Sequence, residues 1–301
     1  MAIDIHQHLW PEPFLAALRA RRTPPHLDGW TLYLPGERPY TIDPAHHDVE
    51  LRAATEPAGV ALVAVSAALG LDRLPPDEAA ALADAWHEGA LALPAPFRVW
   101  ATAGTIAPDP DALDAALVRG AVGLELAADV LADPAGLDRV APLLDVLERA
   151  ARPLLVHPGP AGRLDDPSRP GWWAPVVPYV AQLHAAWWAW AHAGRARFPN
   201  LPVCFVALAG LGPLHGERQR ARGGGPGSIV DPLTFVETSS YGPLAVDAVI
   251  RVLGIDVVCH GSDRPYAEPP RLGGLGAAAE QAIQLANPER LLARLPQEVP
   301  A

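Results

Sequence analysis

The feature that most constrains this chain is a regular alternation of short apolar segments with helix-like ones. Eight short segments rich in Val, Leu, Ile and Ala predict strands, and a helix-like segment follows each of them. The strand-like segments are residues 3–8, 60–65, 97–102, 121–126, 153–157, 202–209, 233–238 and 255–259. This alternation predicts a parallel sheet, and eight units in 301 residues favour a closed (β/α)8 TIM barrel over an open doubly wound sheet.

The rest of the chain is consistent with one domain over residues 1–301. No Gly-x-Gly-x-x-Gly turn follows any of the strand-like segments, which argues against a dinucleotide-binding fold. Residues 23–45 are rich in Pro and Gly, and the stretch from Trp30 to Thr41 predicts a small hairpin. We therefore expect a barrel with a hairpin loop inserted after its first helix.

Composition excludes several classes of function. The formal net charge of −11 argues against a nucleic-acid surface, which needs a basic stripe. The sequence contains no lysine, which excludes a Schiff base, a catalytic lysine and a carbamylated lysine that bridges two metals. No apolar run is long enough to cross a bilayer, and no secretory signal is visible. Cys204 and Cys259 lie in apolar runs, which predicts buried thiols and a cytoplasmic location.

The opening segment Ile3-Asp4-Ile5-His6-Gln7-His8 carries two histidines two residues apart. Side chains at i and i+2 of a strand point to the same face, so His6 and His8 can converge on one point. Two neutral imidazoles on one rigid face form half of a zinc-type ligand set. The alternative is a pair of ordinary polar histidines at the end of a strand.

Two more candidate ligands stand at the ends of later strands, at the mouth where a barrel collects its catalytic groups. His157 ends the fifth strand-like segment, and Asp263 follows the eighth. Separately, they could be a hydrogen-bonded structural histidine and a turn aspartate. Together with His6 and His8, they supply three imidazoles and a carboxylate, which suit one divalent zinc-like ion and a water whose proton Asp263 accepts.

The segment from Asp4 to His8 resembles the His-x-His signature of the amidohydrolase superfamily, and more narrowly the branch that includes aminocarboxymuconate-semialdehyde decarboxylase. Supporting stretches are residues 155–158, 197–201, 261–265 and 286–292. The resemblance implies a metal-dependent barrel in which His6, His8, His157 and Asp263 bind the metal and Asp263 also accepts a proton. It further implies that Glu125, on the fourth strand, approaches the metal directly or through water. A salt bridge between Glu125 and an arginine is the alternative.

The sequence departs from this family at the end of the sixth strand, where a histidine that polarises the substrate is expected. The equivalent stretch is residues 208–212, and Gly210 stands in place of that histidine. Our hypothesis is that His215, five residues later, takes over the role as a catalytic acid or base. There are two alternatives. His215 could be an ordinary surface residue, or His260 could serve as the catalytic acid or base in its place.

Three further residues are candidates for substrate binding. Trp172 and Trp173 follow the fifth strand on the catalytic side and could wall a pocket for a flat or apolar molecule. Glu237, near the end of the seventh strand, faces the barrel interior and could contact substrate or orient a ligand histidine.

The sequence thus leads to one main prediction and two alternatives. The main prediction is a hydrolase in which a metal-activated water attacks an amide, lactone or related carbonyl of a small molecule. One alternative is a non-oxidative decarboxylase of a small unsaturated or aromatic acid, and the other is a barrel that only binds a ligand. We expect one divalent ion of the zinc type and no nucleic-acid or membrane partner, and a homodimer is compatible with the sequence.

Overall fold

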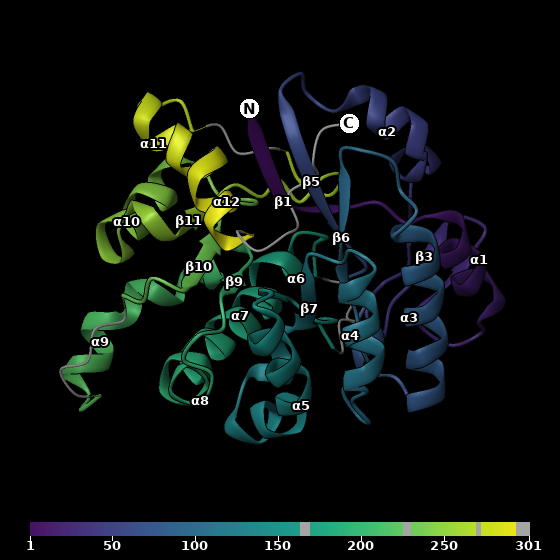
Figure 1. Ribbon diagram of the computed structural model, residues 1–301, viewed down its shortest axis with the longest axis horizontal. Coiled ribbons are helices and arrows are strands. Elements are labelled where there is room, and N and C mark those ends of the chain that lie inside the picture. Colours follow the sequence, from purple (N-terminus) through teal and green to yellow (C-terminus); the bar gives the residue numbers. More distant parts are fainter. Residues whose placement is uncertain (163–168, 225–229, 269–271, 293–301) are drawn as a thin grey trace.

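The computed structural model describes residues 1–162, 169–224, 230–268 and 272–292, which form a (β/α)8 barrel (Figure 1). Its eight parallel strands follow the order β1–β5–β6–β7–β8–β9–β10–β11 in one sheet. They are β1 (Ala2–His8), β5 (Val60–Ser66), β6 (Phe97–Ala101), β7 (Gly123–Ala127), β8 (Leu154–His157), β9 (Val203–Phe205), β10 (Thr234–Glu237) and β11 (Val258–Cys259). The fold class predicted from the sequence is confirmed.

Helices surround this sheet in Figure 1. They are α1 (Glu12–Ala20), α2 (Val49–Thr55), α3 (Pro76–Ala90), α4 (Pro110–Val118), α5 (Pro134–Ala150), α6 (Trp173–Val176), α7 (Pro178–Ala189), α8 (Arg195–Arg197), α9 (Gly216–Ala221), α10 (Pro243–Leu253), α11 (Ala277–Gln281) and α12 (Asn287–Leu291). Within the described ranges, none of the helices has the length and apolar character that crossing a bilayer requires.

Local chemistry explains where several of these helices begin. Asp109 accepts hydrogen bonds from the first backbone N–H groups of α4, and Asp133 does the same for α5. A proline occupies the next position in each case, where its missing N–H costs nothing.

The core lies inside the barrel and between the barrel and its helices. Residues 63–65 of β5 are fully buried, as expected for a parallel strand covered on both faces. The indole of Trp86 donates to the carbonyl of Trp100, and the Trp100 indole donates to the carbonyl of Ile5, both at 2.9 Å. These bonds satisfy polar groups that would otherwise be costly to bury.

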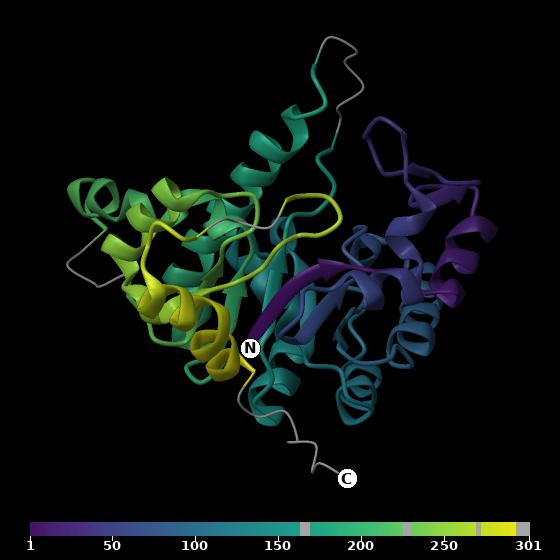
Figure 2. The ribbon, with the colours of Figure 1, turned by 90° about the horizontal axis from the view of Figure 1, so that it is seen from above.

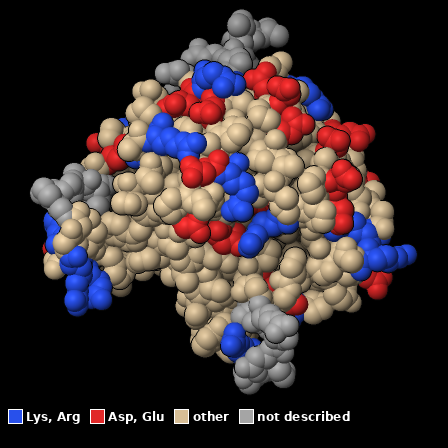
Figure 3. Space-filling view, turned by 90° about the horizontal axis from the view of Figure 1, so that it is seen from below, with Lys and Arg blue, Asp and Glu red and all other residues tan. Residues whose placement is uncertain are grey.

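The insertion after α1 contains one strand more than the predicted hairpin. It is a three-stranded antiparallel sheet of β2 (His26–Asp28), β3 (Thr31–Tyr33) and β4 (Tyr40–Thr41). In Figure 2 the insertion and the segment that carries α6 project from the same side of the barrel. On the face shown in Figure 3, arginine and acidic side chains are interspersed.

The barrel closes differently between β1 and β11 than between its other neighbouring strands. The contacts here are an isolated parallel bridge between Gln7 and Arg264 and a hydrogen bond from Ile5 N to the His260 carbonyl at 3.1 Å. Because β11 is only two residues long, the segment after it completes the closure. We call this junction, formed by β1 and residues 260–264, the seam.

Candidate metal centre

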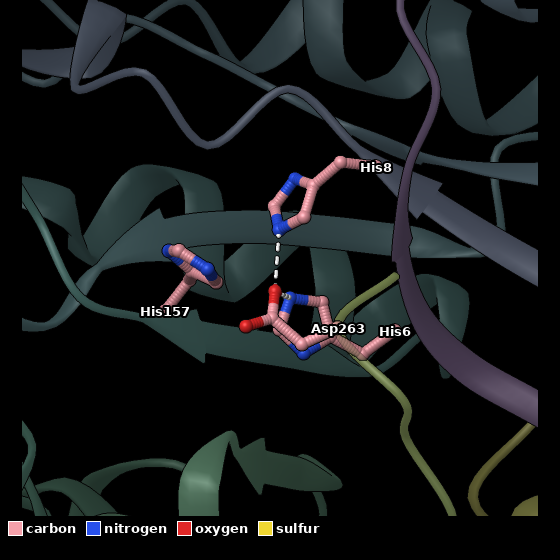
Figure 4. A group of neighbouring side chains, drawn as sticks. All are labelled: His6, His8, His157 and Asp263. Atoms are coloured by element: carbon pink, nitrogen blue, oxygen red, sulfur yellow. Dashed lines mark hydrogen bonds and ion pairs between the residues drawn. The ribbon is translucent and has the colours of Figure 1, made fainter. Parts of the chain in front are cut away.

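The structure brings together the four residues that the sequence predicts as metal ligands (Figure 4). His6 and His8 leave the same face of β1, His157 ends β8, and Asp263 follows β11. The three imidazole centroids lie 5.0 to 5.4 Å apart, with the rings edge to face. One ligand atom from each residue lies within 4.8 Å of the others, so a single ion can contact all four.

The imidazole hydrogen bonds fit a metal-binding role. His6 places Nδ1 at 3.2 Å from the carboxylate of Glu237, and His157 Nδ1 donates to the carbonyl of Pro158 at 2.8 Å. With protons on Nδ1, both rings present the lone pair of Nε2 to the cluster. His6 Nε2 is buried and has no hydrogen-bond partner, a costly state that a bound cation relieves.

Asp263 is the acidic member of the cluster. Its Oδ1 lies 2.9 Å from His8 Nε2 and 3.6 Å from His6 Nε2. Burial raises the pKa of Asp263, but the hydrogen bond from His8 and the charges of the imidazoles outweigh burial and lower this pKa to about 2. Asp263 is therefore a carboxylate at neutral pH, the form that a cation requires.

The imidazoles differ in their protonation. Burial and the charges of His6 and His8 lower the pKa of His157 well below its ordinary value, so His157 is neutral. For His6, burial lowers the pKa, but the hydrogen bond to Glu237 and the nearby carboxylates raise it to about 9. His6 must therefore lose a proton when a metal binds, which makes metal affinity depend on pH.

Glu237 is fully buried and is not among the residues that line the cavity described below, so its position does not support the predicted contact with substrate. Besides His6, its carboxylate accepts hydrogen bonds from Ala207 N at 2.8 Å and from the N and Oγ of Ser239 at 2.5 Å. A Cβ at Gly261 would lie 2.3 Å from Glu237 Oε2, so this glycine leaves room for the carboxylate. Glu237 orients His6, the other role considered from the sequence.

Glu125 is buried near the cluster but is not one of its four members. Its carboxylate accepts a hydrogen bond from Ala68 N at 3.2 Å. Burial and the charge of Asp72 raise the pKa of Glu125 to about 7, so part of the population is protonated at neutral pH. The expectation of direct metal contact by Glu125 is therefore not met in the cluster that the structure forms.

The cluster lies at the base of a cavity of about 720 Å³. Trp173 lines this cavity, whereas Trp172 is not among the lining residues and is 57% exposed, so only one of the two predicted tryptophans walls it. Five other aromatic residues that line the cavity were not predicted from the sequence: Trp10, Tyr40, Tyr179, Tyr241 and Tyr266. Of these, only Tyr266 had a usable signal, because it follows Asp263 by three residues.

The structure also corrects the assignments made after the sixth strand. Residues 207–211 form a left-handed turn, in which Ala207 lines the cavity. Gly210 instead packs against α7, where a Cβ would lie 2.5 Å from the carbonyl oxygen of Val180. In this stretch Val206 and Ala207 therefore face the cavity, whereas Gly210 is not among its lining residues.

His215 lies outside the cavity. Its ring is exposed and contacts the His184 ring edge to face, with the centroids 4.7 Å apart. It does not belong to the cavity lining, so its position does not support the predicted role as an acid or base. His260, the second candidate for that role, lies with Nε2 at 3.8 Å from Asp4 and is likewise not a lining residue.

No protein-family model and no curated protein matches the sequence. Among solved structures, the IDCase of Metarhizium anisopliae matches with a TM-score of 0.71 and 18% identity over 97% of each chain. A 5-carboxyvanillate decarboxylase from Novosphingobium aromaticivorans, complexed with manganese and 4-hydroxy-3-methoxy-5-nitrobenzoic acid, has a TM-score of 0.70 and 14% identity, over 97% of this chain and 96% of that one. A 2,6-dihydroxybenzoate decarboxylase from Rhizobium has a TM-score of 0.64 and 16% identity, over 97% and 98%.

The chain shares the fold of these proteins. A structure named amidohydrolase II also has this fold, with a TM-score of 0.68 and 17% identity, so these likenesses confirm the expected fold. In this chain, three imidazoles and one carboxylate form a cluster whose donor atoms suit a divalent ion.

Proposed function

We propose that this protein is a metal-dependent, non-oxidative decarboxylase of a small aromatic or unsaturated carboxylic acid. The observation that carries the proposal is the His6, His8, His157 and Asp263 cluster at the base of an aromatic-walled cavity. Two proteins of the same fold that act on hydroxylated benzoic acids add support. This reading takes precedence over the hydrolase that the sequence first favoured.

The cluster residues would hold one divalent ion, and the bound ion would supply positive charge that draws substrate oxygens and electron density toward the cavity base. We propose zinc because three of the four donors are imidazoles; manganese, present in one structural neighbour, is the alternative. The aromatic side chains around the cavity would hold a flat molecule and exclude water from it.

The chemical step needs one proton at carbon. When the bond between the carboxylate and the substrate carbon breaks, carbon dioxide leaves and the bonding electron pair stays on that carbon. A proton must then arrive at the same atom. Asp263 lines the cavity and has the one carboxylate in the cluster. Because this carboxylate is ionised at neutral pH, it would first take a proton from solvent water and then pass that proton to the substrate carbon, and we assign it this role.

A hydrolase that attacks an amide or lactone is the second candidate, because the same donor set can also activate water. It ranks second because two proteins of the same fold are decarboxylases of hydroxylated benzoic acids. A barrel that only binds a ligand is the third candidate. His6 Nε2 argues against it, because among the described residues this buried atom makes no hydrogen bond and has only a 3.6 Å contact with Asp263, an arrangement that a bound cation would complete.

Two further assignments complete the proposal. The substrate is a small molecule, since the cavity has the size of an ordinary ligand pocket. Cys204 and Cys259 are both free and buried, which supports a reducing compartment such as the cytoplasm.

The test begins with elemental analysis of protein purified without chelator, which should give about one divalent ion per chain. Chelator-stripped protein is then reloaded with Zn²⁺ or Mn²⁺ and offered a panel of hydroxybenzoic and muconate-type acids. We expect carbon dioxide release from at least one acid, no release after stripping, and none from Asp263→Asn. Hydrolysis of lactones or amides without carbon dioxide release would select the hydrolase instead.

A further inference from the structure

We propose that Arg52 and Glu56 are positioning residues that fix the separation of His8 and Asp263 by closing the seam of the barrel. The inference rests on the proposed function only in taking the four-residue cluster as the metal site. Arg52 lies on α2 and Glu56 directly follows that helix, and neither residue lines the cavity.

Three of the four cluster residues depend on the seam. His6 and His8 come from β1, and Asp263 comes from the segment after β11. Across the seam, Asp263 N donates to the His6 carbonyl at 2.9 Å, and His8 N donates to the Arg264 carbonyl at 2.7 Å. These backbone bonds are few because β11 is only two residues long, so we infer that side chains help to fix how closely the two segments approach.

Arg52 supports β1 at the position of His8. Its NH1 donates to the carbonyl of His8 at 2.9 Å and to the carbonyl of His46 at 2.8 Å. Its NH2 donates to the side-chain oxygen of Gln7 at 2.5 Å. Arg52 is 4% exposed, so these bonds form in a medium where a misplaced charge is costly. The planar guanidinium sets the direction of each bond, which an ammonium group cannot do.

Glu56 supports the other side of the seam. Its Oε1 accepts a hydrogen bond from Arg264 NH1 at 3.1 Å, and its Oε2 accepts one from Gln7 Nε2 at 3.3 Å. Arg264 is the residue next to Asp263, while Gln7 lies between His6 and His8. One carboxylate therefore bonds to both edges of the seam.

Asp4 completes the network on the same side of β1. Its Oδ1 accepts hydrogen bonds from the backbone N–H groups of His6 and Ser262, both at 3.1 Å, and its Oδ2 accepts one from Gln7 at 2.9 Å. With Arg52, Glu56 and Arg264, the network has two positive and two negative groups, so its formal charges balance. We infer that it holds the ligand-bearing segments at a fixed distance before a metal arrives.

The experiment compares Arg52→Lys and Glu56→Gln with Arg195→Lys, a matched control. Arg195 also makes an ion pair and several carbonyl hydrogen bonds, but it joins α8 to β10 far from the seam in sequence. Zn²⁺ and Mn²⁺ are titrated separately into chelator-stripped full-length proteins by calorimetry. The melting temperature of each metal-free protein is measured in parallel.

We expect both seam variants to bind metal about 10- to 100-fold more weakly than wild type, the usual size of an effect on ligand orientation. The control variant, Arg195→Lys, should have a lower melting temperature than wild type but the same metal affinity. Unchanged affinity in a folded seam variant would overturn the proposal. If Arg52→Lys does not fold, Glu56→Gln decides the result, because it retains hydrogen-bonding groups of the same shape.

These outcomes are separable from those of the proposed function. A wild-type protein that binds metal and loses affinity in the seam variants, but decarboxylates nothing, would reject the decarboxylase and keep this inference. If the wild-type protein is a decarboxylase but its seam variants bind metal as tightly as wild type, the decarboxylase proposal is kept and this inference is rejected.

Discussion

His6 and Glu237 face each other across the barrel interior, with His6 Nδ1 at 3.2 Å from Glu237 Oε1. They come from the first and seventh strands of the barrel and are separated by 231 residues. Because the other nitrogen of His6 points into the ligand cluster, the carboxylate determines which nitrogen can bind a metal. Glu237 can therefore influence the cavity through His6, although Glu237 is not itself one of the lining residues.

Replacement of Glu237 should therefore weaken metal binding. We expect Glu237→Gln to lower metal affinity about 10- to 100-fold, because a neutral amide no longer fixes the Nδ1 proton of His6 by charge. Calorimetric titration with Zn²⁺ measures this effect. Glu217→Gln, the same change at an exposed position on α9, is the control and should bind as wild type does. Equal affinities in all three proteins would contradict the orienting role.

A second prediction concerns the insertion. Tyr179 on α7 donates its hydroxyl to Glu37 at 3.0 Å, and Ala161 N donates to the same carboxylate at 2.6 Å. These bonds tie the β3–β4 loop to the opposite wall of the cavity. Tyr179→Phe should raise KM by up to about tenfold, the value of one hydrogen bond, with kcat nearly unchanged.

Steady-state kinetics on the acid identified by the panel would measure this. Tyr33→Phe is a suitable control, because Tyr33 lies in the same insertion but stacks on His26 and does not line the cavity. A fall in kcat with constant KM would show instead that Tyr179 acts in the chemical step.

The third prediction concerns stability against acid. His87 accepts a hydrogen bond from Thr102 N at 3.2 Å, and burial lowers its pKa to about 4. Between about pH 6.5 and 4 the unfolded chain therefore binds a proton that the folded protein does not, so His87 lowers stability as the pH falls. The shift corresponds to about 3 kcal/mol.

Urea unfolding of wild type and His87→Gln at pH 7 and pH 4 would test this. The variant should lose about 3 kcal/mol less than wild type over this interval, since glutamine can accept the same bond without titrating. The buried carboxyl groups are common to both proteins and cancel in the difference. If both proteins lose the same free energy of unfolding between pH 7 and pH 4, His87 is not the group responsible.

The fourth prediction is an absence of effect. His215 is exposed and lies outside the cavity, so His215→Ala should retain activity within about twofold of wild type, as expected for a surface substitution. Turnover of the metal-loaded enzyme measures this directly. A loss of about tenfold or more would restore the hypothesis that His215 serves as the acid or base.

Most of the barrel and all four cluster residues could be predicted from the sequence. Buried parallel strands are continuous apolar runs, and regular spacing of these runs identifies the fold. Once the order of strands is known, the polar residues at their ends must meet at one mouth. That rule, together with the family resemblance, led to His6, His8, His157 and Asp263, which the structure brings together, and also to Glu125, which is not a member of the cluster.

The errors lie where the backbone leaves regular structure. The sixth strand ends at Phe205, earlier than predicted, and the left-handed turn of residues 207–211 changes which residue faces the cavity. A strand-end comparison does not apply inside such a turn, so it could not show that Ala207 lines the cavity and that Gly210 packs against α7. The cavity tyrosines were missed because they come from the insertion, from the start of α7 and from loops, whose positions are set by contacts between distant segments.

By itself, the sequence determined the class of fold and the residues of the four-membered cluster, because the periodicity of the apolar runs locates the strands and the cluster residues stand at or just after strand ends. Only the tertiary structure decided that Glu237 is sealed beneath His6, that Ala207 faces the cavity, and that Arg52 and Glu56 join the two sides of the seam. These relations depend on the distance between segments far apart in the chain. No local pattern of residues encodes that distance. It is set by the packing of the segments against one another when the barrel closes.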